Sequence, residues 1–363
     1  LTTVALTAML SAPLVRLIDI PRYGIFVRGR SGSHKTEWSK AAMCLWGPDF
    51  ADESSLIKFG STWNSLVYMA ASASDAPFFV DNYKPNNQNA AHFIQFVHMI
   101  MEGREKNRMA QNMSLQAARE INTIPLITGE DVPEDDGATQ ARLLIVPFAA
   151  WKGGIHERLN AAQADAHHLS AVGRAWIEWL ERDGRDVAGR MMQDFNRYRA
   201  RWAQALTSKR SDVLNPLRLA SNLAANEIVY RIALQQPVIG PVLARYETEH
   251  LDGLRRLAGY MAETTAESME AVRFLGMIKS MLLDDSAHIA DLRVSPTSDE
   301  RKLLIGWQDE ETVFLHMQLT KRRIERAFGP YALSEMSDRQ IWAQLESICL
   351  LYTSDAADDR TWG

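Results

Sequence analysis

The stretch Gly29-Arg-Ser-Gly-Ser-His-Lys-Thr36 has the spacing of a loop that binds nucleotide phosphates. It fits the pattern G-x-x-x-x-G-K-[ST], except that His34 stands where glycine is usual. In such a loop the backbone N–H groups point at phosphate oxygens, and glycines allow the phosphates to approach closely. The expected nucleotide-binding residues are Gly29, Gly32, Ser33, His34, Lys35 and Thr36.

Lys35 and Thr36 would supply the charge and the metal ligand of this loop. We expect Lys35 to reach the β and γ phosphates of ATP and the Thr36 hydroxyl to hold Mg²⁺. The alternative is a glycine- and serine-rich turn that happens to precede Lys-Thr. An apolar stretch before the loop and an amphipathic one after it favour the phosphate-binding interpretation.

The second half of such a site should be acidic, and Asp81 follows the apolar stretch Phe78–Val80. We expect Asp81 to bind Mg²⁺, directly or through water. The next residue is Asn82, where a second carboxylate often activates the attacking water. An amide cannot act as a general base. Asn82 therefore puts the rate of ATP hydrolysis in question. Glu130 is the next candidate for the general base. Thr128 ends a further apolar stretch and could orient water or the γ-phosphate.

Arg142 begins the apolar stretch after that one. It either faces a neighbouring subunit's nucleotide as an arginine finger or is an ordinary surface cation at the start of a strand. The two cysteines, Cys44 and Cys349, fit no metal-ligand spacing.

The elements that must position these residues alternate between strands and helices. Strands are expected over residues 23–28, 76–80, 121–128 and 142–148, and helices over 3–16, 36–45 and 90–101. Apolar strands that alternate with helices predict an α/β fold with a mostly parallel sheet covered on both faces. From residue 155 to about 283 the pattern is helical. Two strands (303–307 and 312–316) and a basic helix (320–328) then suggest a small winged-helix-like unit.

We therefore predict a P-loop ATPase domain over residues 1–152, a helical region over 153–290 and a winged-helix-like candidate for DNA binding over 291–348. Residues 349–363 resemble a translated sequencing adapter, with an ordinary polar tail as the alternative. The first residue is Leu and no signal peptide is evident, so we expect further sequence upstream.

The composition is that of an ordinary globular protein. Of the 363 residues, 46% are hydrophobic and 23% charged, and the formal net charge is −5. These values exclude a disordered or collagen-like chain, and no apolar run is long enough to span a membrane. We expect a cytoplasmic protein whose nucleic-acid contacts are local.

Two basic clusters are candidates for such contacts. Lys106 and Arg108 lie between the second and third strands, where loops of ring helicases face the central channel, although a solvated turn is an equal alternative. Lys321, Arg322 and Arg323 lie on the predicted C-terminal basic helix, whose alternative is an ordinary exposed helix face.

The order of these pieces resembles a family of P-loop ATPases that carry the 927 domain of unknown function (DUF927). The matching stretches are 21–36, 46–48, 62–64, 78–85, 126–131, 141–146, 305–309 and 337–345. The family is similar to superfamily 3 and AAA+ replicative helicases of phage-like and integrative elements, which work as rings on DNA. The resemblance implies nucleotide and metal roles for Lys35, Thr36 and Asp81, a sensor role for Thr128 and a finger role for Arg142.

The sequence thus predicts an ATP-dependent, helicase-like motor that acts on DNA as an oligomeric ring, with a primase–polymerase domain on the upstream part. Two alternatives stay open: another P-loop enzyme such as a kinase, and a DNA-binding adaptor that binds ATP but hardly hydrolyses it.

Overall fold

The computed structural model describes residues 1–84, 87–105, 108–109, 115–116, 118–132, 137–149, 154–208, 213, 215–267, 270–310, 312–329, 332–333 and 341. Contacts divide the chain into two compact units, residues 1–265 and 266–363. Each unit is described by itself. The predicted tail 349–363 and most of the helix expected from Ser337 lie outside the described residues.

The first unit is built on a parallel sheet of four strands. These are β1 (Gly24–Arg28), β2 (Pro77–Tyr83), β5 (Ile124–Gly129) and β6 (Leu143–Pro147). Their order is β2-β5-β1-β6, and every pairing is parallel. The four predicted strands and the predicted parallel sheet are thus confirmed, and β1 occupies an interior position.

Side chains of the sheet alternate between two apolar cores, as period-2 strands require. Ile25 and Val27 face a core that includes α1 (Thr2–Leu10), α3 (Lys35–Met43) and α11 (Pro216–Ala233), whereas Phe26 faces a core with α4 (Trp63–Ser72) and α5 (Asn87–Glu102). Both faces of the sheet are therefore buried, which explains why its strands are nearly continuous apolar runs.

Short elements connect these parts of the first unit. They are α2 (Leu14–Ile18), η1 (Pro48–Ala51), η2 (Glu53–Ser55), α6 (Gly137–Gln140) and the antiparallel pair β3 (Arg108–Met109) and β4 (Leu115–Gln116). The pair β3–β4 is inserted between α5 and β5, the place where the sequence has its first basic cluster.

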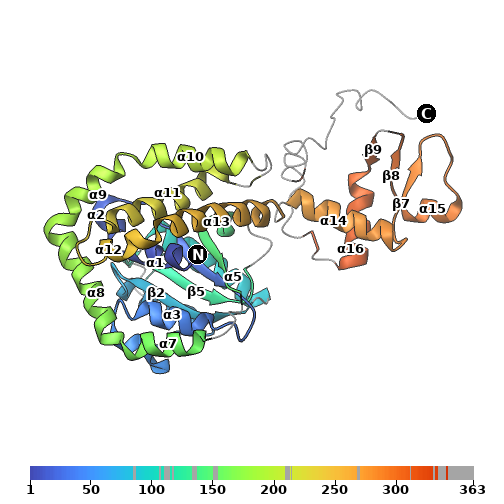
Figure 1. Cartoon of the computed structure of the whole chain (residues 1–363). Helices are drawn as coiled ribbons and strands as arrows, with labels where there is room; N and C mark the ends of the chain where they lie inside the picture. Colours follow the sequence, from blue (N-terminus) through green and yellow to red (C-terminus); the bar gives the residue numbers. More distant parts are fainter. Residues whose placement is uncertain are drawn as a thin grey trace. The chain divides into compact units, whose positions relative to one another are not determined.

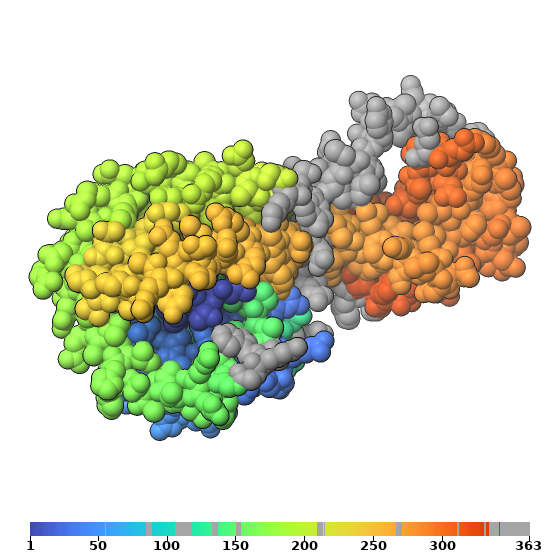
Figure 2. Space-filling model, viewed as in Figure 1, coloured from blue at the N-terminus to red at the C-terminus, as the bar shows by residue number. Residues whose placement is uncertain are grey.

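A long run of helices continues the first unit. It comprises α7 (Ile155–Ala164), α8 (Ala166–Trp179), η3 (Leu180–Gly184), α9 (Arg185–Met192), α10 (Phe195–Thr207), α11, α12 (Gly240–Leu243), η4 (Ala244–Tyr246) and α13 (Glu247–Glu267). Figure 1 shows α8, α9 and α10 as an arc around the sheet. In Figure 2, α13 (yellow) runs over the dark-blue N-terminal segment, in agreement with the contact of Gly253 with Val4.

These helices share one apolar core with the sheet. Trp176, Trp202 and Leu223 belong to the same buried cluster as Ile25 and Val27. The helices up to residue 265 are therefore part of the same compact unit as the sheet, whereas the sequence predicted a separate region that begins at residue 153.

The second unit combines a small sheet with two helices. Its elements are α14 (Glu270–Leu283), β7 (His288–Asp291), α15 (Ser298–Leu303), β8 (Leu304–Gln308), β9 (Val313–Leu315) and α16 (Met317–Phe328). The predicted two strands and basic helix are present as β8, β9 and α16. The sequence did not predict β7, which pairs parallel to β8, while β9 pairs antiparallel to it.

Buried side chains of α14, β8 and α16, including Phe274, Ile305 and Ile324, form the core of the second unit. The Thr320 hydroxyl also donates a hydrogen bond of 3.2 Å to the Ile305 carbonyl, which fixes α16 against β8. Of the cations of α16, Arg322 and Arg326 are exposed. Within the described residues, no helix is both long enough and apolar enough to cross a membrane.

Candidate functional site

The predicted phosphate loop lies at the carboxyl end of β1, between its two neighbours. Arg28 pairs with Gly129 of β5 and with Pro147 of β6, so residues 29–34 leave the sheet between the ends of these two strands. In the sheet, β5 and β2 lie on one side of β1, and β6 lies on its other side. A crevice at such a reversal of strand order is the usual ligand site of open α/β sheets.

The conformation of the loop explains its two glycines. A Cβ on Gly29 would lie 2.5 Å from the Phe148 carbonyl oxygen and 2.9 Å from Ser33 Oγ, so only glycine fits. Gly32 has φ +77°, and His34 has φ +64°, both in the left-handed region. His34 stands in the pattern's second glycine position, and it adopts a conformation that glycine adopts most easily.

Ser33 and Lys35 line the inner side of the loop. Ser33 is buried, and its Oγ has no hydrogen-bond partner among the described residues. Lys35 begins α3 and donates a 3.1 Å hydrogen bond from Nζ to the Arg30 carbonyl, so its amine folds back over the loop. Burial lowers the pKa of Lys35, while the charges of Glu130 and Asp81 act to raise it.

Three predicted residues from three separate elements converge at the second half of the site. The Thr36 hydroxyl of α3 donates a 2.9 Å hydrogen bond to Asp81 Oδ1, at the end of β2. The Thr128 hydroxyl of β5 donates to the same oxygen. Asp81 and Thr128 are buried, with 6% and 0% of their surface exposed. The structure therefore brings the predicted metal residues, Thr36 and Asp81, together with the predicted sensor residue.

These donors fit a magnesium ion. The Thr36 hydroxyl and the Asp81 carboxylate are adjacent oxygen ligands beside the phosphate loop. No cluster of three or more His, Cys, Asp or Glu side chains among the described residues could hold a metal by itself. Mg²⁺ is commonly held by one or two protein oxygens, with substrate phosphates and water completing its coordination, so this small donor set suits it.

Asn82 lies beside this cluster, but its side chain is exposed. Its backbone N–H donates a 3.0 Å hydrogen bond to Thr128 Oγ1, and its φ of +63° is one that asparagine tolerates better than most residues. The link from Asn82 to the cluster is therefore made by its backbone.

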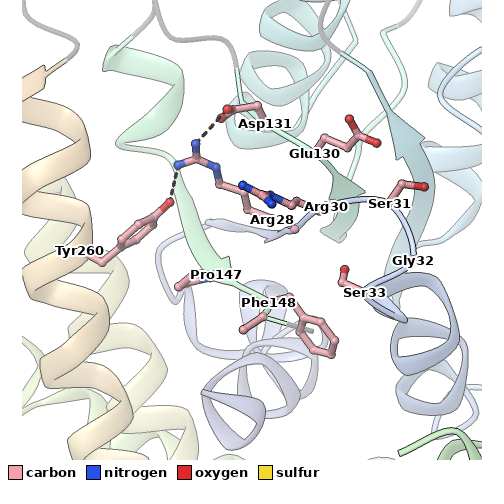
Figure 3. A pocket seen from close by; sticks show the side chains of 12 residues that line it. Arg28, Arg30, Ser31, Gly32, Ser33, Glu130, Asp131, Pro147, Phe148 and Tyr260 are labelled. Atoms are coloured by element: carbon pink, nitrogen blue, oxygen red, sulfur yellow. Dashed lines mark hydrogen bonds and ion pairs between the residues drawn. The ribbon is translucent and has the colours of Figure 1, made fainter. Parts of the chain in front are cut away.

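A pocket of about 970 Å³ opens beside the loop (Figure 3). Its lining includes loop residues 29–33 together with Glu130, Asp131 and Phe148. Tyr260 of α13 completes it from a distant part of the sequence.

Arg28 joins three elements at the rim of this pocket. It donates a 2.9 Å hydrogen bond to Asp131 Oδ2, which is also an ion pair, and a 2.5 Å hydrogen bond to the Tyr260 hydroxyl (Figure 3). Burial alone would lower the pKa of Arg28, but these two partners raise it overall. The sequence analysis missed Arg28, Asp131 and Tyr260; the charged residue directly before Gly29 was the one available signal.

Arg142 lies at the other end of the sheet. It directly precedes Leu143, which pairs with Gly24 at the start of β1, and its guanidinium donates a 2.7 Å hydrogen bond to the Ala138 carbonyl. Five strand residues separate it from the edge with the loop, roughly 16 Å at the usual rise per residue. Arg142 therefore does not reach the phosphate loop of its own chain, and its role toward a neighbour stays a prediction.

The predicted nucleic-acid residues fall in two places. Arg108 lies on β3, whereas Lys106 is outside the described residues. Lys321, Arg322 and Arg323 all lie on α16, where Arg322 is exposed and the other two are half-buried.

Comparison with known proteins supports this description. Residues 1–120 match the model of a family described as "Domain of unknown function (DUF927)", which confirms the resemblance seen in the sequence. A solved structure described as "SCCmec type IV Cch - active helicase" is similar with a TM-score of 0.64 at 12% identity. The similarity covers 96% of this chain and 62% of the helicase chain. No curated protein matches the chain.

At this identity the likeness to the helicase shows the fold alone. The predicted α/β fold of the P-loop NTPase type is thereby confirmed. The chain spans less than two thirds of the helicase's length.

Proposed function

We propose that this protein is an ATP-hydrolysing, helicase-like motor that acts on DNA during replication of a mobile element. The observation that carries the proposal is the convergence of Thr36, Asp81 and Thr128 beside a loop that presents Lys35. A phosphate loop, a hydroxyl and a buried carboxylate in this arrangement are what phosphoryl transfer requires. The fold shared with a solved helicase supports the extension from ATP hydrolysis to a motor.

Each residue of the loop has a distinct task in this proposal. The backbone of residues 29–34 holds the phosphates. When ATP binds, the Lys35 amine gives up its hydrogen bond to the Arg30 carbonyl and contacts the β and γ phosphates instead. Thr36 and Asp81 hold Mg²⁺. When bound, the ion neutralises charge that develops on the phosphate oxygens. Thr128 relays the state of the γ-phosphate, because its hydroxyl contacts both Asp81 and the backbone of Asn82.

DNA contacts would come from two basic surfaces. The first is the inserted pair β3–β4, which carries Arg108 and is preceded by Lys106. The second is α16 with Lys321, Arg322 and Arg323. Its neighbour β9 exposes Val313 and Phe314, with 51% and 50% of their surface accessible. Cations and exposed apolar side chains on consecutive elements suit a strand of nucleic acid, which offers phosphates and base faces.

Assembly and context complete the proposal. Arg142 cannot serve its own loop, so we assign it to the nucleotide of a neighbouring subunit in a ring. The upstream part of the protein would carry a primase–polymerase domain, and the cytoplasm is the compartment in which such a motor would work.

Steady-state ATP hydrolysis by the full chain, with and without single-stranded DNA, tests this proposal. A motor hydrolyses ATP faster when DNA is present. A kinase would be insensitive to DNA and would need an acceptor. An adaptor, the alternative that Asn82 favours, would bind ATP with little turnover in either condition. DNA-independent or absent hydrolysis would overturn the motor proposal.

A further inference from the structure

We propose that the carboxylate of Glu130 is the general base that accepts a proton from the attacking water. This inference rests on the proposed ATPase function and assigns the group that the position of Asn82 leaves missing. Glu130 follows Gly129, the last residue of β5, and lines the same pocket as the phosphate loop.

The placement of Glu130 is fixed by the pairing of β5 with β1. The Gly29 N–H donates a 3.0 Å hydrogen bond to the Gly129 carbonyl, so the residue after Gly129 stands beside the first residue of the loop. The Glu130 side chain is exposed and lines the same pocket as residues 29–33. Figure 3 shows the Glu130 side chain in this pocket together with Ser31 and Ser33 of the loop.

The position of Lys35 relative to the pocket supports the same role for Glu130. Glu130 lines the same pocket as loop residues 29–33, and the Lys35 amine donates a 3.1 Å hydrogen bond to the Arg30 carbonyl of that loop. Lys35 is the residue that contacts the β and γ phosphates in the proposed function. A carboxylate in the pocket that this loop lines is therefore on the side of the loop where the reacting phosphoryl group would lie.

The backbone on both sides of Glu130 is held. On one side, Gly129 is packed so closely that a Cβ would lie 2.5 Å from the Phe26 ring and 2.9 Å from the Tyr83 carbonyl oxygen. On the other side, Asp131 is fixed by Arg28 at 2.9 Å, and its Oδ1 accepts a 2.9 Å hydrogen bond from the Val132 N–H. Glu130 therefore projects from a rigid position, which catalysis by an oriented base requires.

The other carboxylate and the amide of the site are less suited to the task. Asp81 is buried and already accepts hydrogen bonds from Thr36 and Thr128, as expected of a metal ligand. Asn82 carries no group that can take a proton. Glu130 is exposed to the solvent from which the attacking water comes.

The reaction balances with Glu130 as base. The water oxygen forms a bond to the γ-phosphorus while the bond from that phosphorus to the β–γ bridging oxygen breaks. One proton of the water passes to the Glu130 carboxylate, and the bridging oxygen leaves with ADP. The products are ADP and inorganic phosphate, and Glu130 then returns its proton to solvent.

The test compares Glu130→Gln with the parent chain, since glutamine keeps the size of the side chain and loses the base. We expect hydrolysis to fall by about 10²- to 10⁴-fold. We expect the affinity for Mg–ATP, measured by equilibrium binding, to stay the same or rise. Nucleotide recovered from the Glu130→Gln protein after incubation should be ATP, whereas the parent should yield ADP.

The exposed Glu181, far along the sequence in η3, gives a matched control: Glu181→Gln should behave like the parent. Hydrolysis by Glu130→Gln within threefold of the parent rate would overturn the inference, as would loss of Mg–ATP binding by a folded variant. A parent chain that hydrolyses no ATP would instead overturn the proposed function, so the two failures are distinguishable.

Discussion

Thr36 and Asp81 are joined by a 2.9 Å hydrogen bond between the first turn of α3 and the end of β2. The chain must fold its central sheet to form this contact, because β5 lies between β1 and β2. The contact places a pair of oxygen donors beside the phosphate loop, which is the chemical requirement for a magnesium–nucleotide site.

A first prediction concerns Gly29. In Gly29→Ala the new methyl group would press on the Phe148 carbonyl and on Ser33, so we expect a loss of about 1–3 kcal/mol in the free energy of unfolding. Binding of Mg–ATP should weaken as well, because the loop must shift. Denaturant unfolding and equilibrium nucleotide binding measure the two effects.

Gly189→Ala is the control: its Cβ would meet nothing within 4 Å, and alanine is the better helix former in α9. Equal stability of the two variants would show that the loop does not have the packing described.

A second prediction concerns Arg142. Arg142→Ala should bind ATP almost as the parent does and hydrolyse it on the order of 10³-fold more slowly, the effect typical of an arginine finger. Mixed with Lys35→Ala, it should regain part of the activity, since each variant supplies the group that the other lacks. No regained activity in mixed oligomers, with co-assembly shown by sizing, would leave Arg142 without a role at a neighbour's site.

A third prediction concerns α16. Replacement of Lys321, Arg322 and Arg323 by alanine should weaken binding to single-stranded DNA. The slope of log binding constant against log salt concentration should also become shallower by roughly 2, because each lost phosphate contact removes about 0.7. The control replaces Arg301 and Lys302 on α15 of the same unit, where Lys302 is already paired with Asp299 at 2.9 Å. An unchanged slope in the α16 variant would exclude this helix from the DNA contact.

A fourth prediction concerns pH. His250 is buried and stacks on Tyr230, with ring centroids 3.8 Å apart, and neither of its ring nitrogens has a hydrogen-bond partner among the described residues. Burial, with a smaller effect of Arg231, lowers the pKa of His250 to about 3. The folded protein thus keeps this side chain neutral, whereas the unfolded chain takes up a proton below about pH 6.5.

Stability should therefore fall as the pH drops from about 6.5 towards 3, because the unfolded state binds the extra proton. His250→Phe should have a smaller loss between these pH values in thermal unfolding. The exposed His168 provides the control, as His168→Phe removes a histidine without touching the core. An identical pH profile for the parent and His250→Phe would contradict this account.

Local sequence patterns predicted the elements of the site but not all of its contacts. Short apolar runs precede the loop, Asp81 and Thr128, so the strands and the loop could be located. The parallel order of the strands then brought Thr36, Asp81 and Thr128 to one edge. Arg142 was found at the start of its strand, but only the register shows that it lies at the edge away from the loop.

Contacts between distant parts of the chain were beyond the reach of such patterns. Arg28 and Tyr260 are 232 residues apart, and no periodicity relates them. The strand β7 is only four residues long, and its alternation is too short to separate it from the preceding helix. The shared core of the sheet and the helices after residue 155 likewise depends on packing, which helical spacing alone does not specify.

The most direct test of the central claim is a side-by-side measurement of Mg–ATP hydrolysis, with single-stranded DNA present, by the parent chain and by Lys35→Ala. Lys35 is half-buried, and within the described part of the chain its amine is hydrogen-bonded to the Arg30 carbonyl alone, so its loss should leave the fold and the thermal unfolding midpoint intact. The account predicts DNA-stimulated hydrolysis by the parent and none above background by the variant. Hydrolysis at the parent rate by a folded Lys35→Ala protein would contradict the assignment of residues 29–36 as the nucleotide-binding loop.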